Sequence, residues 1–149
     1  MTWTRVDLAC TGGVRARLVF TDRVGTGTGG SSRSPYDRAN LASHVGDQPS
    51  AVVANRTELA RVLDVPTGRM AFMHPDHGRG VALVGPTDLT PTGVQPGAEV
   101  PGVDALVTAE PGIGLVALGA DCVPALLVDP VASVVAAVHS GWRGLVADV

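Results

Sequence analysis

Lysine is absent from this 149-residue chain, and all eleven of its basic residues are arginine. A Schiff-base mechanism, or any other that depends on a lysine amine, is therefore excluded. Aromatic residues make up only 3% of the chain, and its apolar 45% consists mostly of Val, Leu and Ala. That composition favours buried strands packed by aliphatic side chains over an aromatic platform that stacks nucleic-acid bases.

Runs of positive charge are also lacking, and the formal net charge is −3. We therefore expect neither nucleic acid nor a membrane as a partner. No apolar stretch resembles a signal peptide or reaches the length of a transmembrane helix, so the expected location is the cytoplasm. In such a setting, Cys10 and Cys122 are expected to be thiols rather than a structural bridge.

The length and apolar content indicate a single domain spanning residues 1–149, with a real hydrophobic core. The clearest local pattern is the helical periodicity of residues 49–63. Asp47 is expected to be the N-cap of this helix, with Pro49 in its first turn. Alternation and apolar content predict strands at residues 14–21, 70–73 and 81–84.

Gly-rich and Pro-rich segments predict loops at residues 25–35 and, as a long surface excursion, at residues 85–102. Four short apolar runs follow and are expected to be central strands of a covered sheet, because they are apolar on both faces. They are residues 105–108, 114–118, 124–128 and 133–138. The last residues, 144–149, are expected to begin an amphipathic helix.

Three side chains with metal-binding chemistry lie where predicted strands meet turns, which is where ligand sites of sheet proteins gather. They are His77, Cys122 and His139. Two imidazoles and a thiolate suit zinc and also accept copper. Three protein ligands would leave a fourth position open for water or substrate, as in a catalytic zinc site. The alternative is an inert buried cysteine with two hydrogen-bonded histidines.

Other polar residues are candidates for contacts with a substrate. Arg143 lies between glycines near the start of a predicted helix and is suited to hold phosphate, although a plain helix-end contact is equally compatible. Asn40 and His44 are candidate substrate contacts, with turn formation before the helix as the alternative.

Five blocks of the chain, in order, resemble the YfiH-type family, whose labels are multicopper polyphenol oxidase, laccase-domain protein and purine nucleoside phosphorylase. Two of these blocks are specific as a pair: Ala-Asp-Cys-x-Pro at Ala120–Pro124 and His-x-Gly-Trp-Arg-Gly at His139–Gly144. The other three are weaker individually: Phe20–Gly25 with the loop after it, Asn40–Asp47, and His77-Gly78. The segment Val103–Thr108, which leads into the cysteine block, also follows the family pattern.

The resemblance implies an α/β fold in which mixed sheets are flanked by helices in layers. It also implies a zinc site formed by His77, Cys122 and His139, with copper as an older interpretation. The implied reaction cleaves a purine nucleoside (adenosine, inosine or guanosine) with phosphate, giving the base and ribose 1-phosphate. Adenosine deaminase and methylthioadenosine phosphorylase activities are further implications of the same resemblance.

The chain departs from the family in two places. Pro75 and Asp76 stand before His77 where family members place Gln and an apolar residue, so any role of that Gln side chain is lost. The family also continues well past the Trp-Arg segment. The domain is therefore expected to be incomplete at its C-terminal end, with self-association through that end.

The residues and the resemblance together predict metal-assisted chemistry on a purine nucleoside. Zinc would activate a water, and Arg143 would help to orient phosphate. His44 is the candidate proton shuttle or sugar contact, with Asn40 as its orienting partner. Two alternatives stay open: a copper-dependent oxidase of phenols, although four histidines are few for a multicopper centre, and an inactive metal-binding fragment.

Overall fold

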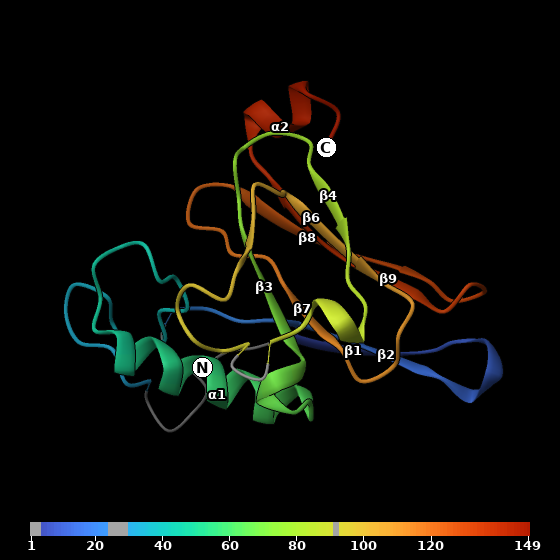
Figure 1. Cartoon of the computed structure of the whole chain (residues 1–149), viewed down its shortest axis with the longest axis horizontal. Helices are drawn as coiled ribbons and strands as arrows, with labels where there is room; N and C mark the ends of the chain where they lie inside the picture. Colours follow the sequence, from blue (N-terminus) through green and yellow to red (C-terminus); the bar gives the residue numbers. More distant parts are fainter. Residues whose placement is uncertain (1–3, 24–29, 91–92) are drawn as a thin grey trace.

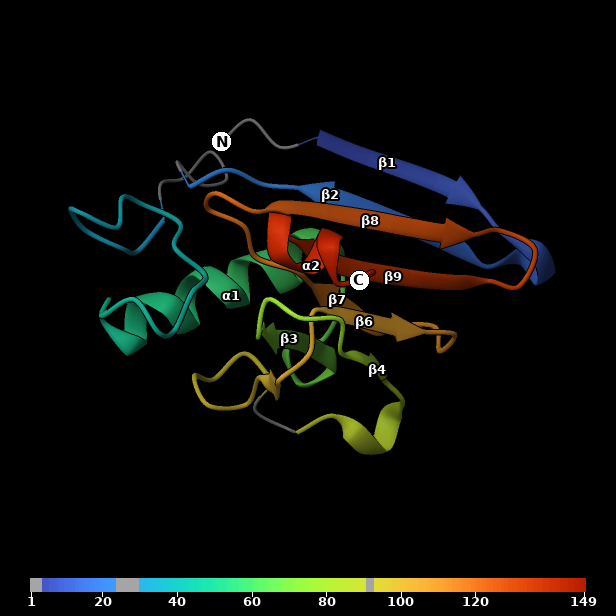
Figure 2. The same cartoon turned by 90° about the horizontal axis from the view of Figure 1, so that it is seen from above.

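The computed structural model of the chain describes residues 4–23, 30–90 and 93–149, so part of the predicted Gly-rich loop, residues 25–29, lies outside them. The α-helices are α1 (Pro49–Leu63) and α2 (Trp142–Val146). The strands are β1 (Thr4–Ala9), β2 (Arg15–Phe20), β3 (Met70–His74), β4 (Val81–Leu83), β5 (Val100–Pro101), β6 (Ala105–Thr108), β7 (Gly114–Val116), β8 (Val123–Asp129) and β9 (Val134–Ser140). Figures 1 and 2 show their arrangement.

The strands pair into three sheets, with orders β1-β2, β5-β3-β7 and β4-β6-β9-β8. β1 and β2 form an antiparallel hairpin, whereas β3 runs parallel to both of its neighbours. In the third sheet β4 and β6 are parallel, and β9 is antiparallel to β6 and β8. The predicted α/β fold with mixed sheets is therefore confirmed.

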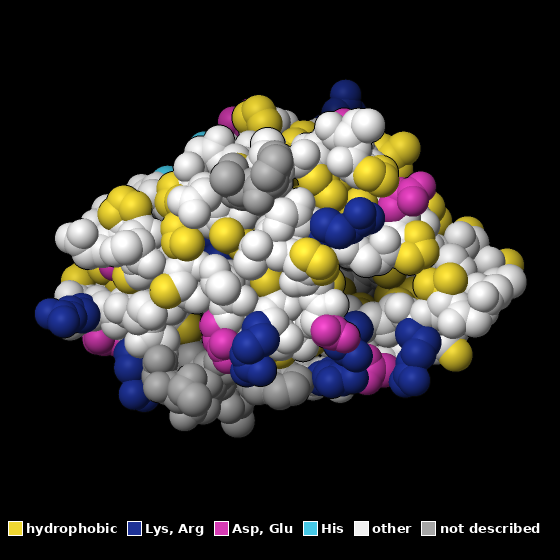
Figure 3. Space-filling model, turned by 60° about the horizontal axis from the view of Figure 1, so that its bottom comes forward, with side chains coloured by type: hydrophobic (Ala, Val, Ile, Leu, Met, Phe, Trp, Pro, Cys, Tyr) yellow, Lys and Arg dark blue, Asp and Glu magenta, His cyan; other side chains and the backbone are white. Residues whose placement is uncertain are grey.

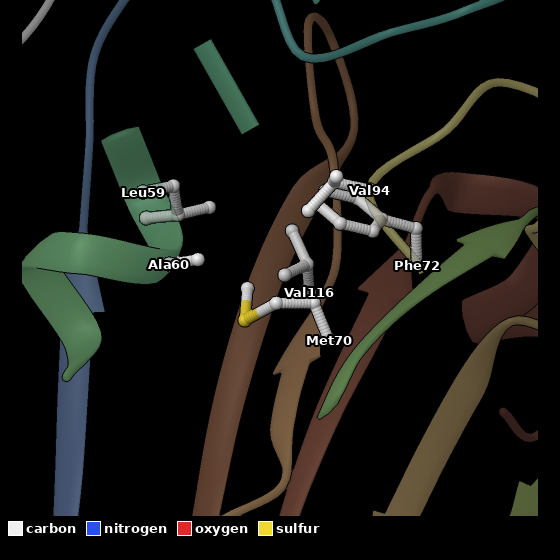
Figure 4. Packing of buried hydrophobic residues seen from close by; sticks show 6 residues of the cluster. All are labelled: Leu59, Ala60, Met70, Phe72, Val94 and Val116. Atoms are coloured by element: carbon white, nitrogen blue, oxygen red, sulfur yellow. The ribbon is translucent and has the colours of Figure 1, made fainter. Parts of the chain in front are cut away.

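β3 lies at the centre of the core because both of its faces are covered. Met70 and Phe72 point to one side, where they pack with Leu59 and Ala60 of α1 (Figure 4). Ala71 and Met73 point to the other side, against a cluster that includes Leu106 of β6. A strand buried on both faces is apolar throughout rather than alternating, which explains why Met70–Met73 has no polar residue.

Helix α1 has the bounds that its periodicity predicts, with Pro49 at its first position. The predicted N-cap is wrong. Gln48 occupies that position without a capping side chain, while the Asp47 carboxylate accepts hydrogen bonds from Ser32 Oγ and Asn40 Nδ2. Asp47 therefore joins the preceding loop to the helix start instead of capping the helix.

The expectation that all four late apolar runs are central strands is also wrong. β6 and β9 lie inside the third sheet, but β8 lies at its edge and β7 at the edge of the second. Val123 and Leu127 of β8 are 67% and 57% exposed. Apolar content does not separate an edge strand from a central one, because that distinction depends on which strands pair.

Two further predictions need correction, and one strand was not predicted. The segment 85–102 is not only a surface excursion, since it contains β5 and places Val94 in the core. The final helix begins two residues earlier than expected, at Trp142, and ends at Val146. β1, which the sequence analysis did not predict, is exposed along its whole length and extends β2 into a hairpin.

Within the described residues, no helix is both long enough and apolar enough to span a membrane. On the face shown in Figure 3, arginine side chains are interspersed with acidic ones and do not gather into one basic patch.

Candidate metal centre

The fold brings together three residues that are far apart in the sequence, His77, Cys122 and His139. His77 lies in the turn after β3, Cys122 directly precedes β8, and His139 is the penultimate residue of β9. Each offers one ligand atom, and these atoms all lie within 4.8 Å of one another. The imidazole rings of His77 and His139 stand edge to face, with centroids 4.9 Å apart.

Antiparallel pairing of β8 with β9 brings Cys122 to His139, because the register places Pro124 opposite His139 and Val123 opposite Ser140. The chain then turns at Gly141, where a Cβ atom would lie 2.6 Å from Cys122 Sγ. A side chain at this position would displace the thiol. The glycine between His139 and Trp142 therefore allows the cysteine thiol to approach closely.

The turn that carries His77 has an unusual backbone. His77 has φ of 57°, in the left-handed region that few residues other than glycine adopt. On one side the loop packs against α2, where a Cβ at Gly144 would approach Gly78 O to 3.1 Å. On the other side its backbone N–H groups face a buried carboxylate, that of Asp104.

Asp104 is completely buried and links both histidines. Its Oδ1 lies 3.0 Å from His139 Nδ1 and accepts a 3.0 Å hydrogen bond from His77 N. Its Oδ2 accepts a 2.8 Å bond from Gly78 N. Burial by itself raises the pKa of this carboxyl group, but the hydrogen bonds from His139 and the backbone N–H groups outweigh it and hold the pKa below its usual range. The carboxylate thus stays charged.

The donor set fits a metal ion. Two imidazoles and one thiolate are the ligands that zinc prefers, and copper also accepts them. Because Nδ1 of His139 faces Asp104, Nε2 is the nitrogen left for a metal. His77 is exposed, Cys122 half-buried and His139 buried, so the group opens to solvent on the His77 side.

The cluster lies on the wall of an open cleft of about 1090 Å³. Asn40 and His44 line the same cleft as the three possible ligands. Asn40 is engaged in its own turn, since its side chain bonds to Ala42 N and Ala42 O at 3.0 Å each and also to Asp47. His44 is exposed, and its ring stacks edge to face on His74 with centroids 5.7 Å apart.

Arg143 is placed differently from the other predicted site residues. It lies in the first turn of α2, is exposed, and holds its guanidinium carbon 5.1 Å from the centroid of the Trp142 ring. Among the described residues it does not line the cleft that contains the cluster.

Asp104 was not among the predicted site residues. Its signal was present, because it is an acidic residue directly before the apolar strand β6 and inside a block that follows the family pattern. A charged side chain at the entry of a buried strand needs partners, and nothing local indicates which partners it has.

The chain is similar to known proteins in sequence and in fold. The family model described as multi-copper polyphenol oxidoreductase laccase matches residues 17–149. The chain is 48% identical over 134 residues to purine nucleoside phosphorylase ORF3 of Streptomyces griseus, covering 90% of this chain and 50% of the relative. This chain thus spans about half the length of the curated relatives it matches.

Two crystal structures share the fold. YlmD from Geobacillus stearothermophilus has a TM-score of 0.74 and 40% identity, with 80% of this chain and 44% of that chain covered. The Bacillus licheniformis hypothetical protein YfiH has a TM-score of 0.75 and 31% identity, with 80% and 45% covered. The chain belongs to the multi-copper polyphenol oxidoreductase laccase family, which confirms the resemblance found in the sequence.

Proposed function

We propose that this chain, as a member of that family, forms the metal-binding part of a purine nucleoside phosphorylase that takes zinc at His77, Cys122 and His139. One observation carries the proposal: three side chains with zinc-binding chemistry lie within 4.8 Å of one another on the wall of an open cleft. The relatives named purine nucleoside phosphorylase support the reaction class, which is cleavage of a purine nucleoside by phosphate.

The bound metal and the residues of the cleft would have separate roles in the reaction. Bound zinc supplies positive charge and Lewis acidity at the wall of the cleft. The exposed His44 ring is suited to touch the sugar or to carry a proton, since it lines the same cleft as the cluster. Asn40 acts indirectly in this proposal, because its hydrogen bonds to Ala42 and Asp47 hold the loop that carries His44. Arg143 stays the predicted phosphate contact, although it lies outside the lining of this cleft.

Adenosine deaminase and methylthioadenosine phosphorylase activities belong to the same proposal, since all of these substrates share the purine ring. Cytoplasmic location, the absence of nucleic-acid and membrane partners, and self-association also stay predictions. For self-association the relevant observation is α2, where Trp142, Leu145 and Val146 are 72%, 68% and 78% exposed.

The alternative reaction is copper-dependent oxidation of phenols, which the description of the family favours. The chain has four histidines, and the described residues contain one group of three possible ligands, at His77, Cys122 and His139. These few possible ligands are enough for one metal ion but not for a multicopper centre. A metal-binding fragment without activity is the third outcome that the experiment must separate.

The test combines metal content with activity of the purified chain. We expect one zinc per chain and release of hypoxanthine from inosine that requires phosphate. The Cys122→Ala variant should lose both, while Cys10→Ala, which changes the other free thiol, should lose neither. Zinc binding without base release identifies a fragment that lacks activity by itself. Oxygen consumption with a phenol and added copper would favour the oxidase, and a chain without metal would refute the site.

A further inference from the structure

We propose that Asp104 is the positioning residue of the cluster: its one carboxylate holds both histidine ligands in the arrangement that accepts a metal. The inference rests on the proposed metal site but concerns a residue outside the ligand set. Asp104 lies directly before β6 and is 0% exposed, so it does not reach the cleft itself. Whatever it contributes must act through the residues that it contacts.

The contact with His139 fixes the ring at Nδ1, the nitrogen that is not proposed to bind the metal. The backbone N–H of His139 donates a 2.7 Å hydrogen bond to Asp104 O, and the ring nitrogen Nδ1 lies 3.0 Å from Asp104 Oδ1. A carboxylate can only accept from this ring, so Nδ1 carries the hydrogen and Nε2 keeps its lone pair. Carboxylates that hold a metal-binding histidine in this way set both its tautomer and its orientation.

The contact with His77 acts on the backbone rather than on the ring. Three consecutive N–H groups, those of Asp76, His77 and Gly78, donate to the two carboxylate oxygens at 3.4, 3.0 and 2.8 Å. Successive N–H groups that converge on one anion form a concave nest. The nest accounts for the positive φ of His77 and directs its side chain toward Cys122 and His139.

These two sets of contacts make Asp104 a common support. The ligands come from β9 and from the turn between β3 and β4, and in the third sheet β6 lies between β4 and β9. Backbone hydrogen bonds link these segments through Asp104, whose N–H donates to Gly80 O at 2.8 Å and whose carbonyl oxygen accepts from His139 N at 2.7 Å. The Asp104 carboxylate bonds to both within one side chain, so its removal should loosen the ligands relative to each other even where the fold survives.

A purely structural role predicts a different outcome, and a matched variant separates the two. Glu99 is also a buried carboxylate with several hydrogen bonds, to Arg56, Ser43 and Gly97, but it has no contact with the cluster. Asp104→Asn and Glu99→Gln each replace a carboxylate by an amide of the same shape. Both should lower the melting temperature, and only the first should weaken the metal site.

The measurement is zinc affinity of the purified full chain, determined by competition with a chromophoric chelator, together with the visible spectrum of the cobalt-loaded protein. We expect Asp104→Asn to lose about 10- to 100-fold in zinc affinity and to shift the cobalt ligand-field bands. Glu99→Gln should stay within about twofold of the original chain, as expected for a residue outside the shell around the ligands. A folded Asp104→Asn variant with unchanged affinity and spectrum overturns the proposal.

A second measurement needs no variant and no metal. Long-range proton–nitrogen spectra of the metal-free chain at pH 8 identify which nitrogen of His139 carries the hydrogen. The proposal requires Nδ1, so hydrogen on Nε2 refutes it even where Asp104→Asn does not fold. If the chain binds no zinc, the proposed metal site is refuted. The His139 tautomer still decides whether Asp104 orients this ring.

Discussion

Two buried carboxylates, those of Glu99 and Asp104, each accept several hydrogen bonds but differ in the groups that they hold in place. Glu99 pairs with the fully buried Arg56 at 2.7 Å, and Arg56 also donates to Leu41 O at 2.8 Å. Asp104 pairs with His139 and with the turn of His77. The Arg56–Glu99 pair is enclosed by its own partners. In the Asp104–His139 pair, Asp104 contacts Nδ1 of the imidazole, and the other ring nitrogen, Nε2, is left to face Cys122 and His77.

The difference shows what makes a buried charge functional. Arg56 has no acceptor site, and its guanidinium also lies 4.1 Å from the centroid of the Phe72 ring. This pair therefore connects α1 to the loops that contain Leu41 and Glu99. Through Ser43, which donates to Glu99 at 2.6 Å, it also holds the loop of His44. One network thus supports the cleft, and the other supports the atoms proposed to bind metal.

The largest expected effect comes from breaking the Arg56–Glu99 pair. Arg56→Met should destabilise the fold by about 3–5 kcal/mol, because it leaves the Glu99 carboxylate buried without its cation. Urea unfolding followed by circular dichroism measures the change. Arg61→Met on the same helix is the control, since its pair with Glu58 is exposed and should leave the unfolding midpoint almost unchanged. Equal effects of the two variants would contradict the role assigned to burial.

The next effect is on the pH dependence of stability. Burial raises the pKa of Glu99, but hydrogen bonds from Ser43 and Arg56 outweigh it and bring the pKa from 4.5 to about 2. The folded state binds this proton less readily than the unfolded state, so its contribution is complete above pH 4.5 and disappears as the pH falls toward 2. That contribution amounts to about 3 kcal/mol at neutral pH.

Glu99→Gln should therefore be less stable than the original chain at pH 7, and the difference should shrink as the pH falls below 4.5. Unfolding free energies at a series of pH values measure it. The comparison of the two proteins isolates Glu99 from Asp104 and Asp47, whose pKa values are also lowered. A constant difference across this pH range would show that Glu99 is not the titrating group.

The smallest of the three effects should appear at the cluster and leave the Arg56–Glu99 pair untouched. Gly141→Ala adds a methyl group that would lie 2.6 Å from Cys122 Sγ, so the thiol must move. We expect zinc affinity to fall about tenfold, which corresponds to about 1.4 kcal/mol, with little change in the melting temperature. Gly85→Ala is the control, because its methyl group would meet Asp88 at 3.4 Å, an ordinary contact. Unchanged zinc affinity in Gly141→Ala would count against the close packing of the thiol.

Much of the local structure was predictable because it depends on neighbours in the sequence. The bounds of α1 follow from apolar periodicity, a proline at the first position, and Pro66 shortly after its end. The strand at Met70–Met73 is apolar enough to be recognised without its partners. The edge positions of β7 and β8 were not predictable. The sequence of a three- to seven-residue apolar strand does not indicate whether the strand has one neighbour in its sheet or two.

For the candidate site, residue chemistry and strand ends selected His77, Cys122 and His139, and the fold brings these three together. Their binding of zinc stays a prediction. Local sequence did not reveal the shared support of the two histidines, nor that Asn40 is committed to its own turn while Arg143 stands apart from the cleft. These facts depend on the packing of segments that are distant in the sequence.

The sequence by itself determined the donor chemistry and the helix and core strands whose patterns are local. Only the tertiary structure decided that the Asp104 carboxylate contacts both the His139 ring and the backbone of the turn that carries His77. Asp104 and His139 are 35 residues apart, and the pairing of β6 with β9 brings them together. Strand order arises from the packing of the whole core, so no local pattern specifies it.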